Sequence, residues 1–242
     1  MSDREFTNVY RDRDYAASYA ALDWGGTYYL IYRDLPGVVE RYVIGRRALD
    51  FGCGTGRSTR LLRSYGFQVT GIDIAEPMIR GARQLDPEGD YRVWSPEESI
   101  DRPPGGFDLV LAAFPFDNIP ADQKIGLVRA LRDVMTPGGR FINIVSSPEI
   151  YLREWTSFTT ESFPENRAAR TGETVLIVTR EFKSGKPAED ILCTPETYRA
   201  IYDECGLEIL AEERPLGREE DGVTWVSETT IAPWTIYVVA RK

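Results

Sequence analysis

The chain has 242 residues, a hydrophobic fraction of 42% and a formal net charge of −9. This length suits one domain with added elements, and the hydrophobic fraction is ordinary for a globular fold. The acidity argues against a nucleic-acid partner, because phosphate contacts require clustered Lys and Arg. No apolar run approaches the roughly 20 residues of a membrane helix, so we expect no membrane partner.

The residue types present limit the chemistry. Histidine is absent, which removes the side chain best suited to proton transfer near neutral pH and the commonest metal ligand. The cysteines Cys53, Cys193 and Cys205 have no metal-like spacing, so we expect no metal site and a reduced compartment. Residues 1–6 are charged and lack the apolar core of a signal peptide, which favours a cytoplasmic protein. The sequence singles out no catalytic residue and leaves the oligomeric state open.

The first part of the chain, residues 1–47, is rich in tyrosine. Helical patterns cover residues 13–22 and 36–43, with Pro36 at the start of the second, and a break at Trp24, Gly25 and Gly26 separates them. This arrangement predicts an N-terminal helical lid.

Residues 48–147 alternate between strand and helix patterns. Nearly continuous apolar runs predict strands at 48–51, 68–73, 90–94, 107–113 and 140–145, and amphipathic patterns predict helices at 58–65, 76–85 and 121–135. Residues 136–139, Thr-Pro-Gly-Gly, are expected to stop the last of these helices. Buried apolar strands separated by helices are typical of a parallel sheet covered on both faces. The pattern predicts a doubly wound α/β domain whose ligand lies at the carboxyl ends of the strands.

The pattern changes after the fifth predicted strand. Residues 148–193 mix aromatic and charged side chains and contain one strand pattern, at 173–182, which predicts an insertion on the substrate side. Residues 194–242 predict a helix at 195–205, capped by Thr194, and two final strands at 207–214 and 233–241.

One turn carries the strongest functional signal. Gly52, Gly54 and Gly56 follow the first strand and precede a helix, and Asp73 ends the second strand. Such a glycine turn lets a ligand approach bare backbone, and an acid at the next strand tip suits a ribose diol, so the pattern indicates a nucleoside. The third glycine comes one residue earlier than in a dinucleotide-binding turn, and Asp50 would repel an anion at the helix start. The ligand is therefore expected to be cationic.

These residues, followed by Phe-Asp-Leu-Val at 107–110 and Pro-Gly-Gly at 137–139, resemble the class I S-adenosylmethionine-dependent methyltransferases. The resemblance covers residues 48–147. It implies a Rossmann-like methyltransferase fold, with a mostly parallel seven-stranded sheet, and S-adenosylmethionine as cofactor.

The resemblance also implies roles for single residues. The glycines at 52, 54 and 56 would wrap the methionine part of the cofactor, Asp50 would face its ammonium group, and Asp73 would bind the ribose hydroxyls. The remaining expected cofactor contacts are Ile74 and Met78 at the adenine, either Ser95 or Glu97 at its amino group, Phe114 after the fourth strand, and Tyr19 from the lid.

The long insertion and the lid resemble the small-molecule branch of the family. Expected acceptor contacts are Asp117, Asn118, Glu149, Tyr151 and Trp155. The predicted reaction is methyl transfer to an N, O or C atom of a small metabolite by in-line displacement, with positioning rather than a histidine base. Three alternatives stay open: an enzyme that retains the cofactor for a non-methylating reaction such as cyclisation or decarboxylation, a protein methyltransferase, and a non-enzymatic binding module.

Overall fold

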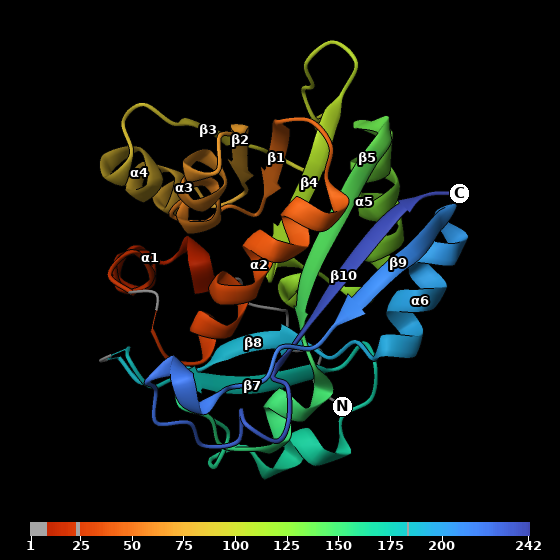
Figure 1. The fold of residues 1–242 in the computed structure, drawn as a ribbon. Helices are drawn as coiled ribbons and strands as arrows, with labels where there is room; N and C mark the ends of the chain where they lie inside the picture. Colours follow the sequence, from red (N-terminus) through yellow and green to blue (C-terminus); the bar gives the residue numbers. More distant parts are fainter. Residues whose placement is uncertain (1–8, 23–24, 183) are drawn as a thin grey trace.

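A computed structural model describes residues 9–22, 25–182 and 184–242, so the predictions for residues 1–6 and for Trp24 lie outside the described residues. The central feature is a seven-stranded sheet with strand order β3-β2-β1-β4-β5-β10-β9 (Figure 1). Its strands are β1 (Arg47–Phe51), β2 (Gln68–Asp73), β3 (Asp90–Val93), β4 (Phe107–Ala113), β5 (Met135–Ser146), β9 (Leu207–Glu213) and β10 (Trp234–Arg241).

The strands β1 to β5 pair in parallel, and β10 runs antiparallel between β5 and β9. The predicted doubly wound, mostly parallel sheet is therefore confirmed. Chain order reverses between β1 and β4, because β1 leads outward to β2 while β4 lies on its other side. In sheets of this kind the ligand crevice lies at the carboxyl ends of the strands at this reversal.

Helices cover both faces of the sheet. They are α1 (Arg13–Ala20), α2 (Tyr29–Tyr42), α3 (Arg57–Ser64), α4 (Glu76–Leu85), α5 (Ala121–Asp133) and α6 (Pro195–Glu204). The helices α2 and α3 pack on one face and α5 and α6 on the other, while α1 lies against α4 (Figure 1). Short 3-10 helices are η1 (Val9–Arg11), η2 (Gly26–Tyr28), η3 (Pro115–Asn118), η4 (Pro148–Leu152), η5 (Pro164–Ala168) and η6 (Glu219–Asp221). Within the described part of the chain, no helix has the length and apolar character needed to cross a membrane.

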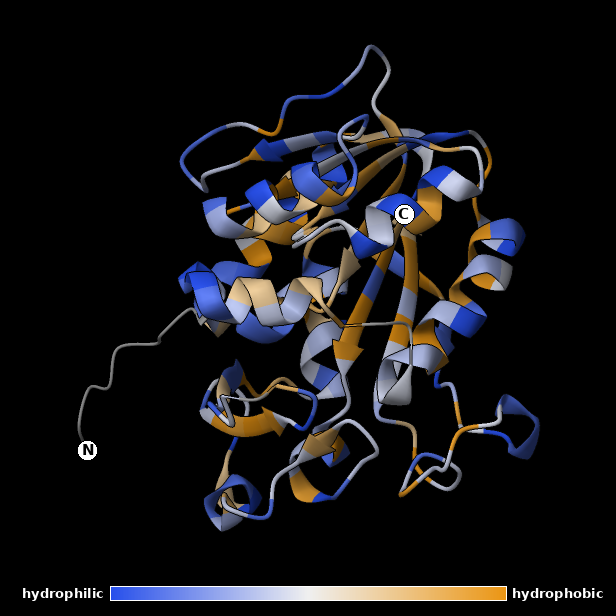
Figure 2. Ribbon diagram, turned by 90° about the vertical axis from the view of Figure 1, so that its left-hand side faces the viewer, coloured by the Kyte–Doolittle hydropathy of each residue, from blue (hydrophilic) through white to orange (hydrophobic). Residues whose placement is uncertain are grey.

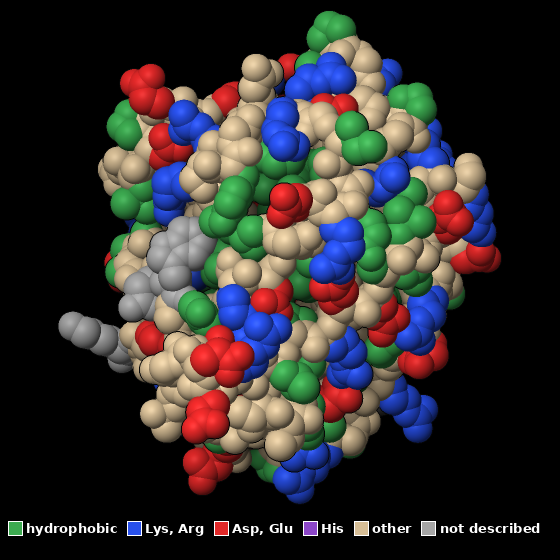
Figure 3. Space-filling model, in the orientation of Figure 1, with side chains coloured by type: hydrophobic (Ala, Val, Ile, Leu, Met, Phe, Trp, Pro, Cys, Tyr) green, Lys and Arg blue, Asp and Glu red, His purple; other side chains and the backbone are tan. Residues whose placement is uncertain are grey.

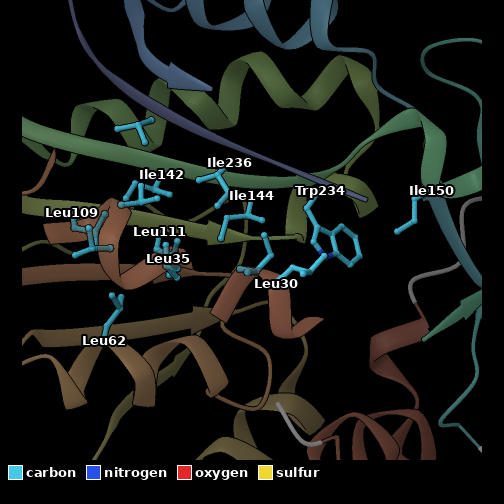
Figure 4. Close-up of a cluster of buried hydrophobic side chains, with 14 of the residues drawn as sticks. Leu30, Leu35, Leu62, Leu109, Leu111, Ile142, Ile144, Ile150, Trp234 and Ile236 are labelled. Carbon is cyan, nitrogen blue, oxygen red and sulfur yellow. The ribbon is translucent and has the colours of Figure 1, made fainter. Parts of the chain in front are cut away.

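The two faces of the sheet bury alternate residues of each strand. In β4, Leu109 and Leu111 join the cluster under α2 and α3, whereas Val110 and Ala112 join the cluster under α5 and α6, as the period of two in a strand requires. Figure 4 shows the first cluster, with Leu30 of α2 lying beside the side chain of Trp234 of β10. Figure 2 shows apolar strands inside and hydrophilic surfaces on the outer faces of the helices.

Two boundaries differ from those predicted. The helix α2 begins at Tyr29 and contains Pro36 in its interior, where a proline removes one backbone hydrogen bond. Leu30, Ile31, Leu35 and Val38 of α2 are almost completely buried and offset that cost. The strand β5 begins at residue 135, so residues 136–139 do not form the predicted stop but lie in the strand, at a register shift opposite β4.

A second, three-stranded antiparallel sheet lies at the carboxyl end of the central sheet (Figure 1). Its strands are β6 (Phe158–Thr159), β7 (Thr174–Thr179) and β8 (Ala188–Ile191). The sequence predicted β7 only, because β6 and β8 are short and lack an alternating pattern. This small sheet falls within the insertion predicted at 148–193. The division of the chain into four parts stays a prediction.

Thr27, between the two N-terminal helices, joins three distant segments. Its N–H donates to Ser157 Oγ at 3.0 Å, its hydroxyl donates to Glu228 Oε1 at 2.7 Å, and its carbonyl accepts from Trp234 Nε1 at 3.1 Å. The Glu228 carboxylate is completely buried and also accepts from the backbone N–H groups of residues 156, 226 and 227. We call Thr27, Ser157, Glu228 and Trp234 the Thr27 junction.

Candidate active site

A pocket of about 1320 Å³ opens beyond the carboxyl ends of β1, β2 and β4. Its lining includes Gly52, Gly54, Asp73, Phe114 and Asn118, which follow those three strands. A typical small-molecule pocket measures roughly 300–1,000 Å³. This pocket exceeds that range, and its lining continues along α5 as far as Asp133 and Val134.

The glycine turn forms one wall. Gly52, Gly54 and Gly56 have φ values of 68°, 53° and 79°, in the left-handed region that favours glycine. A Cβ at Gly56 would lie 2.6 Å from the ring of Tyr91, whereas one at Gly54 would meet only Tyr19, at 3.8 Å. Gly52 and Gly54 border the pocket and Gly56 does not. The close approach of Tyr91 explains the glycine at position 56, and the predicted contact of Gly56 with a ligand stays a prediction.

Asp50 lies beneath the turn rather than in the pocket. Its carboxylate is completely buried, and Oδ2 accepts from Ser58 Oγ at 2.7 Å and from Thr59 Oγ1 at 2.5 Å. Among the described residues, no group donates to its Oδ1. Burial raises the pKa of Asp50 to about 6. Ser58 borders the pocket and Asp50 does not, so the Ser58 hydroxyl links the buried carboxylate to the pocket.

Asp73 borders the pocket, as predicted. Its Oδ2 accepts from the N–H of Gly54 and its Oδ1 from the N–H of Ala75, both at 2.8 Å. Burial raises the pKa of this carboxyl group, although both backbone bonds oppose the shift. Each oxygen keeps a lone pair for a ligand, so the carboxylate both fixes the turn and presents acceptors to the pocket.

Three of the four expected adenine contacts border the pocket, together with Asp73. Ile74 and Met78 border the pocket, and Met78 packs with Ala75 and Ala16. Glu97 also borders the pocket, but Ser95 does not; the Ser95 hydroxyl donates to Glu97 instead and lowers the pKa of that carboxyl group. Of the two residues proposed for the adenine amino group, the structure favours Glu97.

Tyr19 borders the pocket from α1 and contacts a cation that the sequence analysis missed. The guanidinium of Arg57, at the start of α3, lies 5.6 Å from the ring centre of Tyr19 and 5.7 Å from those of Tyr28 and Tyr32. Arg57 also donates to the carbonyl of Leu22 at 2.9 Å. Tyr19, Tyr32 and Arg57 all border the pocket. The position of an arginine directly after a glycine turn was the available signal.

Phe114 has the strained backbone of this site. Its φ of 72° is the one positive value at a non-glycine position in the described residues, and such conformations are typical of functional sites. The ring packs against Trp234, with centroids 4.6 Å apart, and against Tyr28. Phe114 borders the pocket and leads directly into η3.

The two polar residues of η3 have different surroundings. Asn118 borders the pocket, whereas Asp117 is buried behind it and accepts from the backbone N–H and the hydroxyl of Ser146. Burial raises the pKa of Asp117 to about 6. The amide of Asn118 donates to Asp190 Oδ1 at 2.7 Å. Of these two predicted acceptor contacts, the structure brings only Asn118 to the pocket.

The three acceptor contacts predicted in the insertion do not reach the pocket. Glu149 is partly exposed and pairs with Arg214 at 3.3 Å. Tyr151 is buried and donates to Asp190 Oδ2 at 3.0 Å. Trp155 is completely buried, with its indole N–H bonded to the carbonyl of Ile150. All three were predicted from aromatic and charged composition, which does not distinguish a pocket wall from a core.

Two buried charges behind this wall gave no sequence signal. Asp190 of β8 has its pKa raised to about 7, by burial and by the nearby charge of Asp117. Lys124 of α5 is completely buried, and its ammonium donates to the carbonyl of Phe116 and lies over the ring of Tyr198. Burial lowers the pKa of Lys124. In the described part of the chain, no group of His, Cys, Asp and Glu side chains is arranged to hold a metal ion.

Comparison with known proteins supports the fold and includes the glycine turn in the region that matches a known family. Residues 48–139 match the family model of a methyltransferase domain. This part of the chain is a class I S-adenosylmethionine-dependent methyltransferase domain. It contains the glycine turn, Asp73 and β1 to β4, and the glycine turn and Asp73 border the pocket.

Individual proteins are similar to part or to most of this chain. A ubiquinone biosynthesis O-methyltransferase of Xanthomonas campestris is 35% identical over 99 residues, which are 39% of this chain and 41% of the relative. The match thus spans about two fifths of that relative's length. A protein of Pyrococcus horikoshii shares the fold with a TM-score of 0.64, 21% identity and coverage of 89% of this chain and 91% of its own. An S-adenosylmethionine-dependent methyltransferase of Clostridium acetobutylicum has a TM-score of 0.62, 14% identity and coverage of 92% and 94%.

The residues present fit the family's cofactor, S-adenosylmethionine. The unbonded Oδ1 of Asp50 places negative charge beneath the turn, which suits a cationic ligand and opposes a pyrophosphate. Gly54 leaves the backbone open to the pocket, and the acceptors of Asp73 lie at its edge.

Proposed function

We propose that this protein transfers a methyl group from S-adenosylmethionine to an N, O or C atom of a small molecule. The observation that carries the proposal is that one pocket is bordered both by the glycine turn and Asp73 and by Phe114 and Asn118, which follow the fourth strand. When bound, the cofactor supplies an electrophilic methyl group on a sulfonium.

Each residue on the cofactor side would contact one part of S-adenosylmethionine. The backbone of Gly52 and Gly54 would follow the methionine part, and the oxygens of Asp73 would accept from the ribose hydroxyls. Ile74 and Met78 would pack on the adenine, with Glu97 at its amino group. All six residues border the pocket.

The methionine end has two oppositely charged groups to satisfy. The hydroxyl oxygen of Ser58 would accept a hydrogen bond from the ammonium group while its proton is donated to Asp50. The buried carboxylate would therefore stabilise the cation indirectly, through Ser58. The cation of Arg57, held over three tyrosine rings, would attract the carboxylate. Tyr19 would close this end.

The rest of the catalytic task is orientation. Holding two reactants in line removes up to about 7–11 kcal/mol of a barrier without any proton transfer. Aromatic side chains that border the pocket, Phe114, Tyr32 and Trp94, would keep water out. This chemistry suits a chain that contains no histidine.

A small acceptor is favoured by the elements that surround the pocket and by the surface charge. The small sheet and α1 lie beside the carboxyl ends of the central strands, where a macromolecule would need access. Basic and acidic side chains are interspersed on the face shown in Figure 3, many of them paired, such as Arg41 with Glu213 and Arg199 with Glu212. That distribution argues against nucleic acid as substrate. The three cysteines are buried free thiols, which supports a cytoplasmic location.

The test is an assay with methyl-labelled S-adenosylmethionine and a metabolite extract. We expect the label in one small product, identified by mass, and an equal amount of S-adenosylhomocysteine. Label in protein would indicate a protein methyltransferase. Product formed without S-adenosylhomocysteine would indicate a reaction that retains the cofactor, and either result would overturn the proposal.

A further inference from the structure

The Asn118 side chain is oriented by the small sheet. Its Nδ2 donates to Asp190 Oδ1 at 2.7 Å and to the carbonyl of Glu189 at 3.1 Å, both on β8. Asp190 is itself buried, and its Oδ2 accepts from the Tyr151 hydroxyl at 3.0 Å. The amide is therefore held by two acceptors on β8. One of them, the Asp190 carboxylate, is itself held by the Tyr151 hydroxyl.

This arrangement leaves one polar atom of Asn118 for a ligand. A carboxamide has two N–H donors and one carbonyl acceptor, and the two acceptors of β8 use the donors. No residue in the described ranges 9–22, 25–182 and 184–242 is found donating to Oδ1 of Asn118. Since Asn118 borders the pocket, it presents a hydrogen-bond acceptor there and no donor.

The neighbours of Asn118 in the pocket make that acceptor selective. Phe114, Pro115 and Ile119 border the pocket beside it and are apolar. A ligand seated against these side chains shields Oδ1 from water, so a ligand without a donor leaves the carbonyl unsatisfied. Sites built to bond a ligand hydroxyl or amine discriminate strongly against analogues that lack it.

We propose that Asn118 Oδ1 selects methyl acceptors that carry an N–H or O–H group, and that Asp190 is the positioning residue that fixes the polarity of this amide. The inference rests on the proposed function, since it assumes that the methyl acceptor lies beside the cofactor. It narrows the substrate class to amines, N–H heterocycles and hydroxyl compounds. Without Asp190, the carbonyl of Glu189 alone holds the amide, which can then turn and present N–H to the pocket.

The test compares matched ligands on the full chain saturated with S-adenosylhomocysteine, whose binding is first measured by calorimetry. The pairs are phenol and anisole, benzyl alcohol and benzyl methyl ether, and indole and N-methylindole, titrated by ligand-observed NMR. We expect the donor member of each pair to bind at least fivefold more tightly. In Asn118→Leu, which has a similar volume and no acceptor, the preference should fall to less than twofold.

Asp190 provides the matched pair of variants. Asp190→Asn keeps an oxygen that accepts from Asn118, and we expect the donor preference to survive within twofold. Asp190→Leu removes the acceptor and should abolish the preference, in a protein shown by circular dichroism to be folded. If Asp190→Leu does not fold, Asn118→Leu and Asp190→Asn decide the question.

The opposite outcomes are equally clear. Equal binding of donor and capped members, no binding of any member, or a preference that survives Asn118→Leu would overturn the inference. Failure to bind S-adenosylhomocysteine would instead refute the proposed function, so the two failures are distinguishable.

Discussion

The two sides of the pocket are built in different ways. On the cofactor side, the bond between Gly54 and Asp73 joins residues 19 positions apart. On the acceptor side, Asn118 is bonded to Asp190, which is 72 positions away. Behind this side, the Thr27 junction joins Thr27 to Glu228, 201 positions apart, and its Trp234 packs against Phe114. The first side is a property of one strand-turn-helix unit and its neighbour, whereas the second depends on contacts between the insertion and both ends of the chain. Under the proposed function, the methyl donor is therefore bound by local structure, and the methyl acceptor by residues that only the complete fold brings together.

The strongest challenge to this comparison is removal of the buried carboxylate in the Thr27 junction. Glu228→Leu should lower the free energy of unfolding by about 3–5 kcal/mol, because it leaves three backbone N–H groups and the Thr27 hydroxyl without an acceptor. Denaturant unfolding measures the change. Glu208→Leu, at an exposed position of β9, is the matched control and should change stability by less than about 0.5 kcal/mol. A similar loss in both variants would show that the junction does not hold the parts together.

A pair of glycine variants separates packing from binding on the cofactor side. Gly56→Ala should destabilise the fold by about 2–4 kcal/mol, because it combines a left-handed backbone with a Cβ 2.6 Å from Tyr91. Gly54→Ala should cost only about 1–2 kcal/mol of stability, since it meets nothing closer than Tyr19 at 3.8 Å, but it should weaken cofactor binding. Unfolding and calorimetry are measured on both. Equal loss of stability would contradict the division of roles within the turn.

The acceptor side should respond to pH. The pKa of Asp190 is raised from its ordinary value near 3.8 to about 7 in the folded protein, so between these values the folded state binds more protons than the unfolded state. Stability from this group is therefore fully present below about pH 4 and is lost as the pH rises through 7.

Asp190→Asn cannot ionise and isolates this effect. The free energy of unfolding of the wild type, relative to Asp190→Asn, should fall by about 1–3 kcal/mol between pH 4 and pH 8. Asp117 changes in the same direction because burial raises its pKa too. A difference that stays constant, or that grows in favour of the wild type as the pH rises, would contradict the assignment.

The smallest expected change in free energy tests the role of Asp73 on the cofactor side. Asp73→Ala should weaken the affinity for S-adenosylmethionine at least tenfold, about 1.4 kcal/mol or more, because it removes the acceptors offered to the ribose and releases the N–H of Gly54. Asp203→Ala, on the exposed surface of α6, is the control and should bind as the wild type does. Calorimetry measures both, and unchanged affinity in Asp73→Ala would remove the ribose role.

The difference between the two sides of the pocket also explains which features could be predicted from the sequence. The central sheet was predictable because most of its strands contain a short apolar run, and the glycine turn because its spacing is fixed by backbone geometry. Tyr151 and Trp155 were placed wrongly at the pocket, since an aromatic side chain in an insertion is equally suited to a core. Asp190 and Glu228 gave no signal, because their partners lie far away in the sequence.

The central claim is that the two sides of one pocket bind the two substrates separately. Once the labelled-extract assay has identified the acceptor, steady-state kinetics of Asp73→Ala and Asn118→Leu test this claim directly. We predict that Asp73→Ala raises the KM for S-adenosylmethionine at least tenfold and leaves the KM for the acceptor within twofold, and that Asn118→Leu does the reverse. Two variants that raise the same KM, or raise both equally, would contradict the account.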